Sequence, residues 1–350
     1  MSKALRGSAP IRVGIVGAGD NTRSRHIPGL RAIAGVEIVS VCNRRVESSR
    51  KVAEEFHIPT VYATWDALVS ARDTDAIVIG TWPNLHCPVT VAALAAGKHV
   101  LCEARMALNL DEARRMQRAA NQHAELVAQL VPAPFTLRVD RTIVRLIKEG
   151  FLGELLSVEV LVNSGSFIDR DAPLTWRRDE ALSGHNIMSL GIWYETIMRW
   201  VGEAESVLAA GKVFVRRRAD PATGNAREVR IPEHLDVLAE LQQGAQAHLK
   251  ISSVQGLVAE NEVSLFGSEG TLRFIDNALY GGRRGEKALQ KIVVRAEEEG
   301  RWRVEEEFVN AVRGVETVTM TDFATGVRYM AFTEAVHDSL REARRVRVEG

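Results

Sequence analysis

The fold is decided by the stretch Ile11-Arg-Val-Gly-Ile-Val-Gly-Ala-Gly-Asp20, which continues through Asn21 and Thr22. Its apolar run over residues 11–16 contains β-branched side chains and predicts a buried parallel strand. Gly17 and Gly19 then permit a tight turn into a helix, whose free N–H groups and positive dipole end suit a phosphate. Because Thr22 stands where dinucleotide-binding turns have a third glycine, an ordinary strand-to-helix turn explains the stretch about as well.

The same alternation of strand and helix continues to residue 131. Apolar runs predict strands at 36–42, 75–80, 98–102 and 126–130, and helices are predicted between them at 46–56, 89–96 and 110–123. Short buried strands that alternate with helices imply a parallel sheet covered on both faces. We therefore expect a doubly wound α/β domain over residues 1–131.

Hairpin patterns dominate the second half of the chain. A long strand is predicted at 153–162, and paired runs at 235–242 with 244–252 and at 263–266 with 271–274 predict hairpins. Consecutive hairpins imply an open, mainly antiparallel sheet, so residues 132–350 are expected to form an α+β domain. A last helix at 327–344 is expected to pack back, with the first domain as one possible surface. The segment 281–287 is expected to be a loop without obvious chemistry.

Composition excludes several classes of protein. The 45 basic residues equal the 45 acidic ones, so nothing favours nucleic acid or an anionic membrane as a partner. Residues 1–10 lack the apolar core of a signal peptide, and no apolar run approaches the roughly 20 residues of a membrane span, which predicts a cytoplasmic protein. The three cysteines show no CxxC spacing, so no metal site is expected.

The residues after the second strand bear on cofactor choice. Asn43, Arg44 and Arg45 stand where a dinucleotide site contacts the adenosine ribose. An acidic residue there would accept a hydrogen bond from the 2′-hydroxyl of NAD, whereas a neutral residue with arginines suits the 2′-phosphate of NADP. Arginines at the start of helix 46–56 also oppose its dipole, a conflict that a bound anion would remove. The sequence predicts NADP, with NAD as the alternative cofactor and a solvated basic turn as the purely structural one.

Five stretches together resemble the glucose-fructose oxidoreductase/inositol dehydrogenase family, Gfo/Idh/MocA. They are Gly17-Ala-Gly19 with His26, Thr81-Trp-Pro-Asn84 with His86, Ala95-Ala-Gly-Lys-His-Val-Leu-Cys-Glu103, Leu174-Thr-Trp-Arg177 and Gly267-Ser-Glu-Gly-Thr271. The resemblance implies an N-terminal Rossmann domain, a C-terminal domain with an open antiparallel sheet, and a nicotinamide cofactor. It also implies a homodimer or homotetramer that associates through the C-terminal sheet.

The resemblance assigns cofactor contacts to residues of both halves. Glu103 is expected to anchor its loop or the nicotinamide ribose, with a plain surface carboxylate as the alternative. Trp176 and Arg177 match a segment near the carboxamide and substrate, with a cation–π pair as the alternative. The full predicted set is Gly17, Gly19, Asp20, Asn21, Thr22, Asn43, Arg44, Arg45, Thr81, Trp82, Pro83, Asn84, His86, Glu103, Trp176 and Arg177.

The catalytic positions of the family are substituted in this chain. Its Glu-Lys-Pro tripeptide aligns with Glu103, Ala104 and Arg105, so the proton-handling lysine is an alanine. Arg105 stays protonated, which lets it hold an anion but not shuttle a proton; a salt bridge or a cofactor phosphate contact is its alternative role. The family's Asp-x-Gly-x-His motif aligns with Ser189 and Trp193, which replace both of its titratable side chains.

His185 is the titratable group that the sequence leaves near these positions. His185, Ser189 and Trp193 are four residues apart, which places them on one stripe of a helix predicted at 185–200. A helix N-terminus disfavours an imidazolium, so a neutral His185 able to accept a proton is expected there. A structural cap or a surface residue is the alternative for His185. Trp193 is either core or an apolar wall for the substrate.

Three functions follow from the resemblance and the substitutions. The first is an NADP-dependent oxidoreductase that transfers a hydride to or from a secondary alcohol of a sugar, cyclitol or related polyol. The second is a cofactor-retaining lyase or glycosidase that uses transient oxidation. The third is a non-catalytic NADP-binding regulator, because losing every positioned proton donor removes roughly 10²- to 10⁴-fold in rate.

Overall fold

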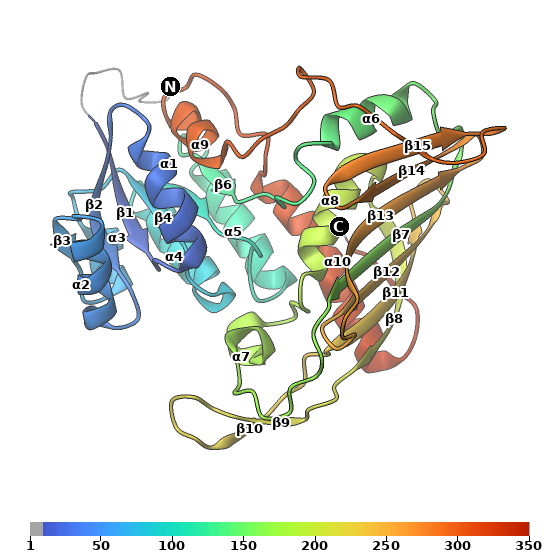
Figure 1. Cartoon of the computed structure of the whole chain (residues 1–350). Coiled ribbons are helices and arrows are strands. Elements are labelled where there is room, and N and C mark those ends of the chain that lie inside the picture. The colour runs from blue at the N-terminus through green and yellow to red at the C-terminus, as the bar shows by residue number, and fades with distance from the viewer. Residues whose placement is uncertain (1–9, 350) are drawn as a thin grey trace. The chain divides into compact units, whose positions relative to one another are not determined.

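The computed structural model describes residues 10–349, which form two compact units (Figure 1). The first unit contains the chain up to Pro132 together with a returning segment, Arg303–Val327. The second contains Ala133–Trp302 and the remainder from Arg328. The expected second domain, 132–350, thus differs from the second unit by the returning segment, and the last helix begins in one unit and ends in the other. Each unit has its own sheet.

The first unit is built on a six-stranded parallel sheet of order β3-β2-β1-β4-β5-β6. This arrangement confirms the doubly wound α/β prediction. The central strands are buried on both faces, as their continuous apolar runs require. The strands are β1 (Ile11–Val16), β2 (Val36–Cys42), β3 (Thr60–Val61), β4 (Ala76–Ile79), β5 (His99–Cys102) and β6 (Ala128–Leu130).

Helices connect these strands; one of them begins earlier than predicted, and α3 (Trp65–Ser70) was not predicted. Helix α4 (Pro83–Ala95) begins at Pro83, so Pro83–His86 lie in its first turn rather than in a loop, and Pro88 lies inside the helix. Both prolines suit a first turn, and the sequence pattern selected the later one. The other helices of this unit are η1 (Thr22–His26), α1 (Ile27–Arg31), α2 (Val46–Glu55), α3 (Trp65–Ser70), α5 (Leu110–Gln122) and α9 (Val304–Val312).

The returning segment is hydrogen-bonded to the edge of this sheet. Leu130 and Thr321 exchange two backbone hydrogen bonds of 2.9 and 3.1 Å. Glu307 of α9 accepts a 3.0 Å hydrogen bond from the side chain of Gln129 and another from the backbone of Thr319. The segment is therefore part of the first unit by its contacts, although some 170 residues separate it from β6 in the chain.

The second unit is built on a nine-stranded sheet of order β16-β15-β14-β13-β7-β12-β11-β8-β17. Both predicted hairpins are present, and only the β7–β12 pair runs parallel, which confirms an open, mostly antiparallel sheet. Its strands are β7 (Leu155–Ser164), β8 (Ala204–Lys212), β11 (His234–Leu241), β12 (Gln246–Ser252), β13 (Ala259–Gly267), β14 (Gly270–Ile275), β15 (Ala278–Arg283), β16 (Gln290–Lys291) and β17 (Val346–Arg347).

Helices cover one face of this sheet. Figure 1 shows α8 (Leu190–Val201) and α10 (Phe323–Glu342) on the same side, where the rings of Tyr194 and Phe332 stack at 3.6 Å. Leu208 and Leu238 form a cross-strand pair between β8 and β11, and both are exposed. The remaining elements of the unit are α6 (Asp140–Lys148), η2 (Trp176–Arg178), α7 (Glu180–Ser183) and a small hairpin, β9 (Arg217–Ala219) with β10 (Ala226–Glu228).

A helix that crosses a bilayer must be long and predominantly apolar. Within residues 10–349, no helix is long and apolar enough to span a membrane.

Candidate functional site

The turn after β1 has the geometry of a backbone cradle. Gly17 has φ +87°, and a Cβ on it would lie 2.7 Å from the backbone nitrogen of Thr81, so only glycine fits there. The Gly17 N–H donates to the carbonyl of Cys42 at 2.8 Å. The Ala18 N–H donates to Oδ1 of Asn43 at 2.7 Å. The loops that follow β1 and β2 are therefore fastened to each other at one edge of the sheet.

Thr22 explains how the chain tolerates the missing third glycine. Thr22 is buried, and its hydroxyl donates to the Gly17 carbonyl at 3.2 Å. The space for this side chain comes from Gly80, at the end of β4, where a Cβ would lie 2.0 Å from the Thr22 hydroxyl. The close approach of helix and strand thus depends on a glycine directly after the strand instead of one in the helix.

Two exposed arginines stand at the start of α2. The guanidinium carbon of Arg44 lies 5.3 Å from the ring centroid of Trp82, a cation–π distance, and Arg45 is the N-cap residue of the helix. Within residues 10–349, neither guanidinium has a carboxylate oxygen within 4 Å. Asn43 is held by its hydrogen bonds to Ala18 and Ser49. This corner is therefore locally cationic.

His86 joins the loops that follow β4 and β5. It is fully buried, and its ring nitrogens lie 3.0 Å from the Thr81 carbonyl oxygen and 2.9 Å from that of Arg105. Burial lowers the pKa of His86. Trp82 and Pro83 open helix α4, with Asn84 in its first turn. His86 therefore positions the strand-end loops that carry Thr81 and Glu103.

Glu103 lies at the centre of a second set of contacts. Its Oε1 accepts hydrogen bonds from the side chains of Asn21 and, at 3.0 Å, His26, and its Oε2 accepts from the Ala104 N–H at 3.2 Å. Burial would raise the pKa of Glu103, but the hydrogen bond and charge of His26 hold it below its usual range. The alternative of a plain surface carboxylate is wrong, because Glu103 fastens Asn21 to its own loop.

The loop after Glu103 carries Ala104 and Arg105. Arg105 is 5% exposed, and its carbonyl is one of the two that His86 contacts. Ala104 offers no side-chain donor or acceptor. Asp20 is exposed in the β1 turn, and its carbonyl accepts a 2.7 Å hydrogen bond from Ser24. The predicted residues of the first unit thus follow β1, β2, β4 and β5, whose carboxyl ends share one edge of the sheet.

Trp176 and Arg177 belong to the second unit and lie in the short helix η2. The guanidinium carbon of Arg177 lies 4.3 Å from the ring centroid of Trp176. This is the cation–π arrangement that the sequence offered as the structural alternative. Their contribution to cofactor binding stays a prediction.

The predicted helix stripe of His185, Ser189 and Trp193 is wrong. Helix α8 begins at Leu190, Ser189 is its N-cap residue, and His185 lies in the preceding link. The link cannot continue a helix, because Met188 has φ +46°, in the left-handed region. Trp193 is 1% exposed and its ring stacks on Phe135 at 4.9 Å, which favours a core residue over a wall for the substrate.

His185 borders a pocket of the second unit instead. Its Nδ1 lies 2.8 Å from Oε2 of Glu334, and its ring stacks on that of His337 at 3.6 Å. Burial and the charge of His185 lower the pKa of His337. The pocket has a volume of about 570 Å³, and its lining includes Glu180, Ile187, Arg230, Ile231 and Arg341.

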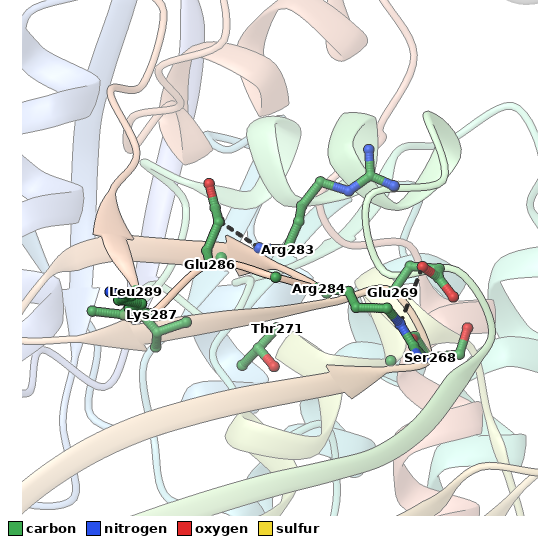
Figure 2. A pocket seen from close by; sticks show the side chains of 13 residues that line it. Ser268, Glu269, Thr271, Arg283, Arg284, Glu286, Lys287 and Leu289 are labelled. Atoms are coloured by element: carbon green, nitrogen blue, oxygen red, sulfur yellow. Dashed lines mark hydrogen bonds and ion pairs between the residues drawn. The ribbon is translucent and has the colours of Figure 1, made fainter.

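A shallower pocket of about 450 Å³ lies at the ends of β13, β14 and β15 (Figure 2). Arg284 and Glu269 form an ion pair of 3.4 Å there, and Glu286 accepts a 2.6 Å hydrogen bond from the Arg283 N–H. Residues 281–283, expected in a loop, belong to strand β15. None of the predicted site residues lines this pocket. Among residues 10–349, no cluster of three or more His, Cys, Asp or Glu side chains could hold a metal ion.

Sequence reasoning missed Glu305, which contacts His26 across 279 positions of the chain. The only local signal was the run Glu305-Glu-Glu307 within an otherwise apolar segment. Charged residues in such a segment indicate either a solvated face or buried partners, and here Glu305 and Glu307 are both buried.

Known proteins resemble the chain along most of its length. The model of the oxidoreductase family with an NAD-binding Rossmann fold, GFO_IDH_MocA, matches residues 11–129, and the GFO/IDH/MocA C-terminal domain matches residues 141–273. Glucose-fructose oxidoreductase domain-containing protein 1 of Mus musculus is 27% identical over 273 residues, 76% of this chain and 67% of that protein. Inositol 2-dehydrogenase/D-chiro-inositol 3-dehydrogenase of Shouchella clausii is 32% identical over 156 residues, 43% of this chain and 44% of that protein.

Solved structures share the fold of the whole chain. An NAD-binding oxidoreductase from Klebsiella pneumoniae has a TM-score of 0.83 at 20% identity, covering 98% of this chain and 100% of that one. A levoglucosan dehydrogenase complex with NADH and levoglucosan has a TM-score of 0.84 at 18% identity, covering 97% of this chain and 100% of that one. The two matching domain models, in the same order as in the chain, carry the assignment: this protein is an oxidoreductase of the NAD-binding Gfo/Idh/MocA family.

Proposed function

We propose that the chain is an NADP-dependent oxidoreductase that transfers a hydride to or from a secondary alcohol of a sugar, cyclitol or related polyol. The observation that carries the cofactor choice is the pair Arg44 and Arg45, which lack a carboxylate partner within residues 10–349 at the start of α2. Guanidinium groups bind phosphate through charge-assisted hydrogen bonds. The three residues directly after β2, Asn43, Arg44 and Arg45, include no acidic side chain that could accept from a ribose hydroxyl.

The first unit fits a dinucleotide. Gly17, with φ +87° and no room for a Cβ beside Thr81, makes a tight turn, and the helix start that follows offers N–H groups to a pyrophosphate. Arg44 and Arg45 would hold the 2′-phosphate, and His86 and Glu103 would keep the strand-end loops in place. The bound nicotinamide supplies the hydride chemistry. The relatives named as inositol and levoglucosan dehydrogenases support a polyol as the substrate class.

Proton transfer requires a group other than the three that stand at the family positions. Ala104 and Trp193 cannot exchange a proton in this role, and the hydroxyl of Ser189 is a weak acid. We propose His185, on a ground different from the helix stripe: its Nδ1 is oriented by Oε2 of Glu334 at 2.8 Å, so Nε2 is the ring nitrogen that would exchange the proton. Arg105 stays protonated, and its proposed role is to hold an oxyanion.

A substrate panel tests the enzyme. The purified chain would be incubated with NADP⁺ and polyols, cyclitols, sugars and sugar acids, and formation of NADPH would be followed by its absorbance. We expect reduction with at least one polyol, and its loss in His185→Ala with NADPH affinity unchanged. Turnover without net change of the cofactor would favour the lyase or glycosidase. Tight NADPH binding with no conversion of any compound would favour the regulator.

We also propose a homodimer or homotetramer that associates through the outer face of the nine-stranded sheet. Leu208 and Leu238 pair across β8 and β11 on this face and are 37% and 40% exposed. Paired exposed leucines on a sheet face are typical of a covered surface. Sedimentation should show an oligomer in the wild type and a smaller species in Leu238→Glu. A monomeric wild type would contradict the proposal.

A further inference from the structure

A buried chain of three titratable side chains links the returning segment to the strand-end loops of the first unit. His26 is 0% exposed and lies between two carboxylates, with Nε2 3.0 Å from Glu103 and Nδ1 2.6 Å from Glu305. Burial would lower the pKa of His26, but these hydrogen bonds raise it to about 9. At neutral pH the ring is therefore an imidazolium that donates to both partners.

The carboxylate of Glu103 also accepts hydrogen bonds from two loops. One of its oxygens holds the Asn21 side chain, in the turn after β1, and the other holds the Ala104 N–H, in the loop after β5. Both loops lie at the edge of the sheet where the cofactor residues gather. A change in the orientation of Glu103 would therefore alter both loops at once.

Glu305 contacts His26 on the side of the ring opposite Glu103. It lies in the first turn of α9, and the packing of α1 is fitted to it: a Cβ on Gly29 would come within 2.9 Å of the Glu305 carboxyl carbon. Any side chain at position 29 would displace Glu305 from His26. The fit indicates that the position of this carboxylate is specified by α1 as well as by α9.

A contribution to the free energy of unfolding does not by itself explain this arrangement of buried charges. Removing two carboxylates and an imidazole from water is costly, and apolar residues of similar volume often serve a core at least as well. A series of buried, hydrogen-bonded charged side chains can instead fix the positions of the two loops at its end, since each hydrogen bond fixes the orientation of the next side chain.

We propose that His26 and Glu305 are positioning residues: through Glu103 they hold Asn21 and the Ala104 N–H in the geometry that the cofactor site uses. The inference rests on the proposed cofactor site for its consequence in binding, whereas the order of the loops is a property of the chain without a cofactor. The returning segment, distant in sequence, thereby controls the cofactor edge of the sheet.

Helix α9 offers a matched control. Glu307 is two residues from Glu305 and equally buried, but its carboxylate binds Gln129 and Thr319 and does not contact the loops of Asn21 or Ala104. Glu305→Gln and Glu307→Gln remove the same charge from the same helix. A purely structural role of α9 predicts the same outcome for both variants.

Hydrogen exchange measured by mass spectrometry on the full chain without nucleotide tests the proposal. We expect Glu305→Gln and His26→Gln to speed exchange in peptides covering 17–26 and 103–108, and Glu307→Gln to speed it only around 128–131 and 319–322. Equal effects of the two glutamate variants on the loop peptides, or no effect of Glu305→Gln there, would overturn the proposal. If Glu305→Gln does not fold, Glu305→Asp and Glu103→Gln address the same chain of contacts.

Binding supplies a second readout. The Kd for NADPH should rise about tenfold in Glu305→Gln, as for a lost hydrogen bond to a charged group, and stay at the wild-type value in Glu307→Gln. In a double-mutant cycle, Glu103→Gln and Glu305→Gln should be non-additive. Additive effects would contradict action through Glu103. A wild type that binds no nucleotide would refute the proposed function and leave the exchange experiment to decide this inference.

Discussion

The carboxyl edge of the parallel sheet and the three positions Ala104, Ser189 and Trp193 differ in the chemistry that their side chains offer. The edge keeps its glycine turn, His86 and Glu103, all held by hydrogen bonds to backbone groups. By contrast, Ala104 and Trp193 offer no side chain that could exchange a proton, and Ser189 offers only a hydroxyl. A cofactor site that depends on backbone geometry cannot change without a change in the fold. A single titratable side chain, by contrast, can be replaced while the surrounding backbone stays the same.

Trp193 gives the largest effect expected from this comparison. Trp193→Ala should lower the free energy of unfolding by about 3–5 kcal/mol, because it empties the space of a ring that is 1% exposed and stacked on Phe135. Urea denaturation measures the change. Trp82→Ala, at a half-buried helix start, serves as the control with a smaller loss. A cost below about 1 kcal/mol for Trp193→Ala would mean that the ring faces an open cleft after all.

His26 predicts how stability depends on pH. Its pKa in the folded chain, about 9, exceeds the 6.5 of the free side chain, so its stabilisation is complete below pH 6.5 and is lost as the pH rises through 9. The difference corresponds to at most about 3 kcal/mol. Urea denaturation at pH 6.5 and 9.5 should show this loss in the wild type and a smaller one in His26→Gln. The same loss in both proteins would refute a charged His26.

The arginine pair sharpens the cofactor side of the comparison. Replacing Arg44 and Arg45 together by alanine should weaken NADPH binding by about 10- to 100-fold, the loss of two charge-assisted contacts, with little change for NADH. Fluorescence titration with each nucleotide measures both values. Arg50→Ala, farther along the same helix, is the matched control. Equal losses of affinity for NADPH and NADH would mean that Arg44 and Arg45 do not contact the 2′-phosphate.

Ala104→Lys introduces the lysine that the family resemblance leads us to expect after Glu103, and it has the smallest expected effect. If the proton path has been rebuilt around His185, a lysine here should raise the rate on polyols by less than about tenfold, well below the 10²- to 10⁴-fold of a positioned proton donor. Steady-state rates on the best polyol of the panel measure this. A gain of a hundredfold or more would show instead a dehydrogenase that has lost one residue.

The features predicted correctly from the sequence are those that depend on residues close together in the chain. The strands, the turn at Gly17 and the hairpin between β11 and β12 follow from apolar periodicity and glycine placement. The four-residue spacing of His185, Ser189 and Trp193 matched a helix that the left-handed backbone of Met188 interrupts. A positive φ is uncommon for methionine, so the sequence at position 188 does not predict this conformation. The His26–Glu305 contact joins residues 279 positions apart, a distance at which no local pattern carries information.

One equilibrium titration tests the account most directly. The wild-type chain, freed of any nucleotide retained in purification, would be titrated with NADPH and with NADH under one set of conditions. We expect NADPH to bind at least about tenfold more tightly than NADH, because Arg44 and Arg45 have no carboxylate partner within residues 10–349. Equal affinity, or tighter binding of NADH, would contradict it.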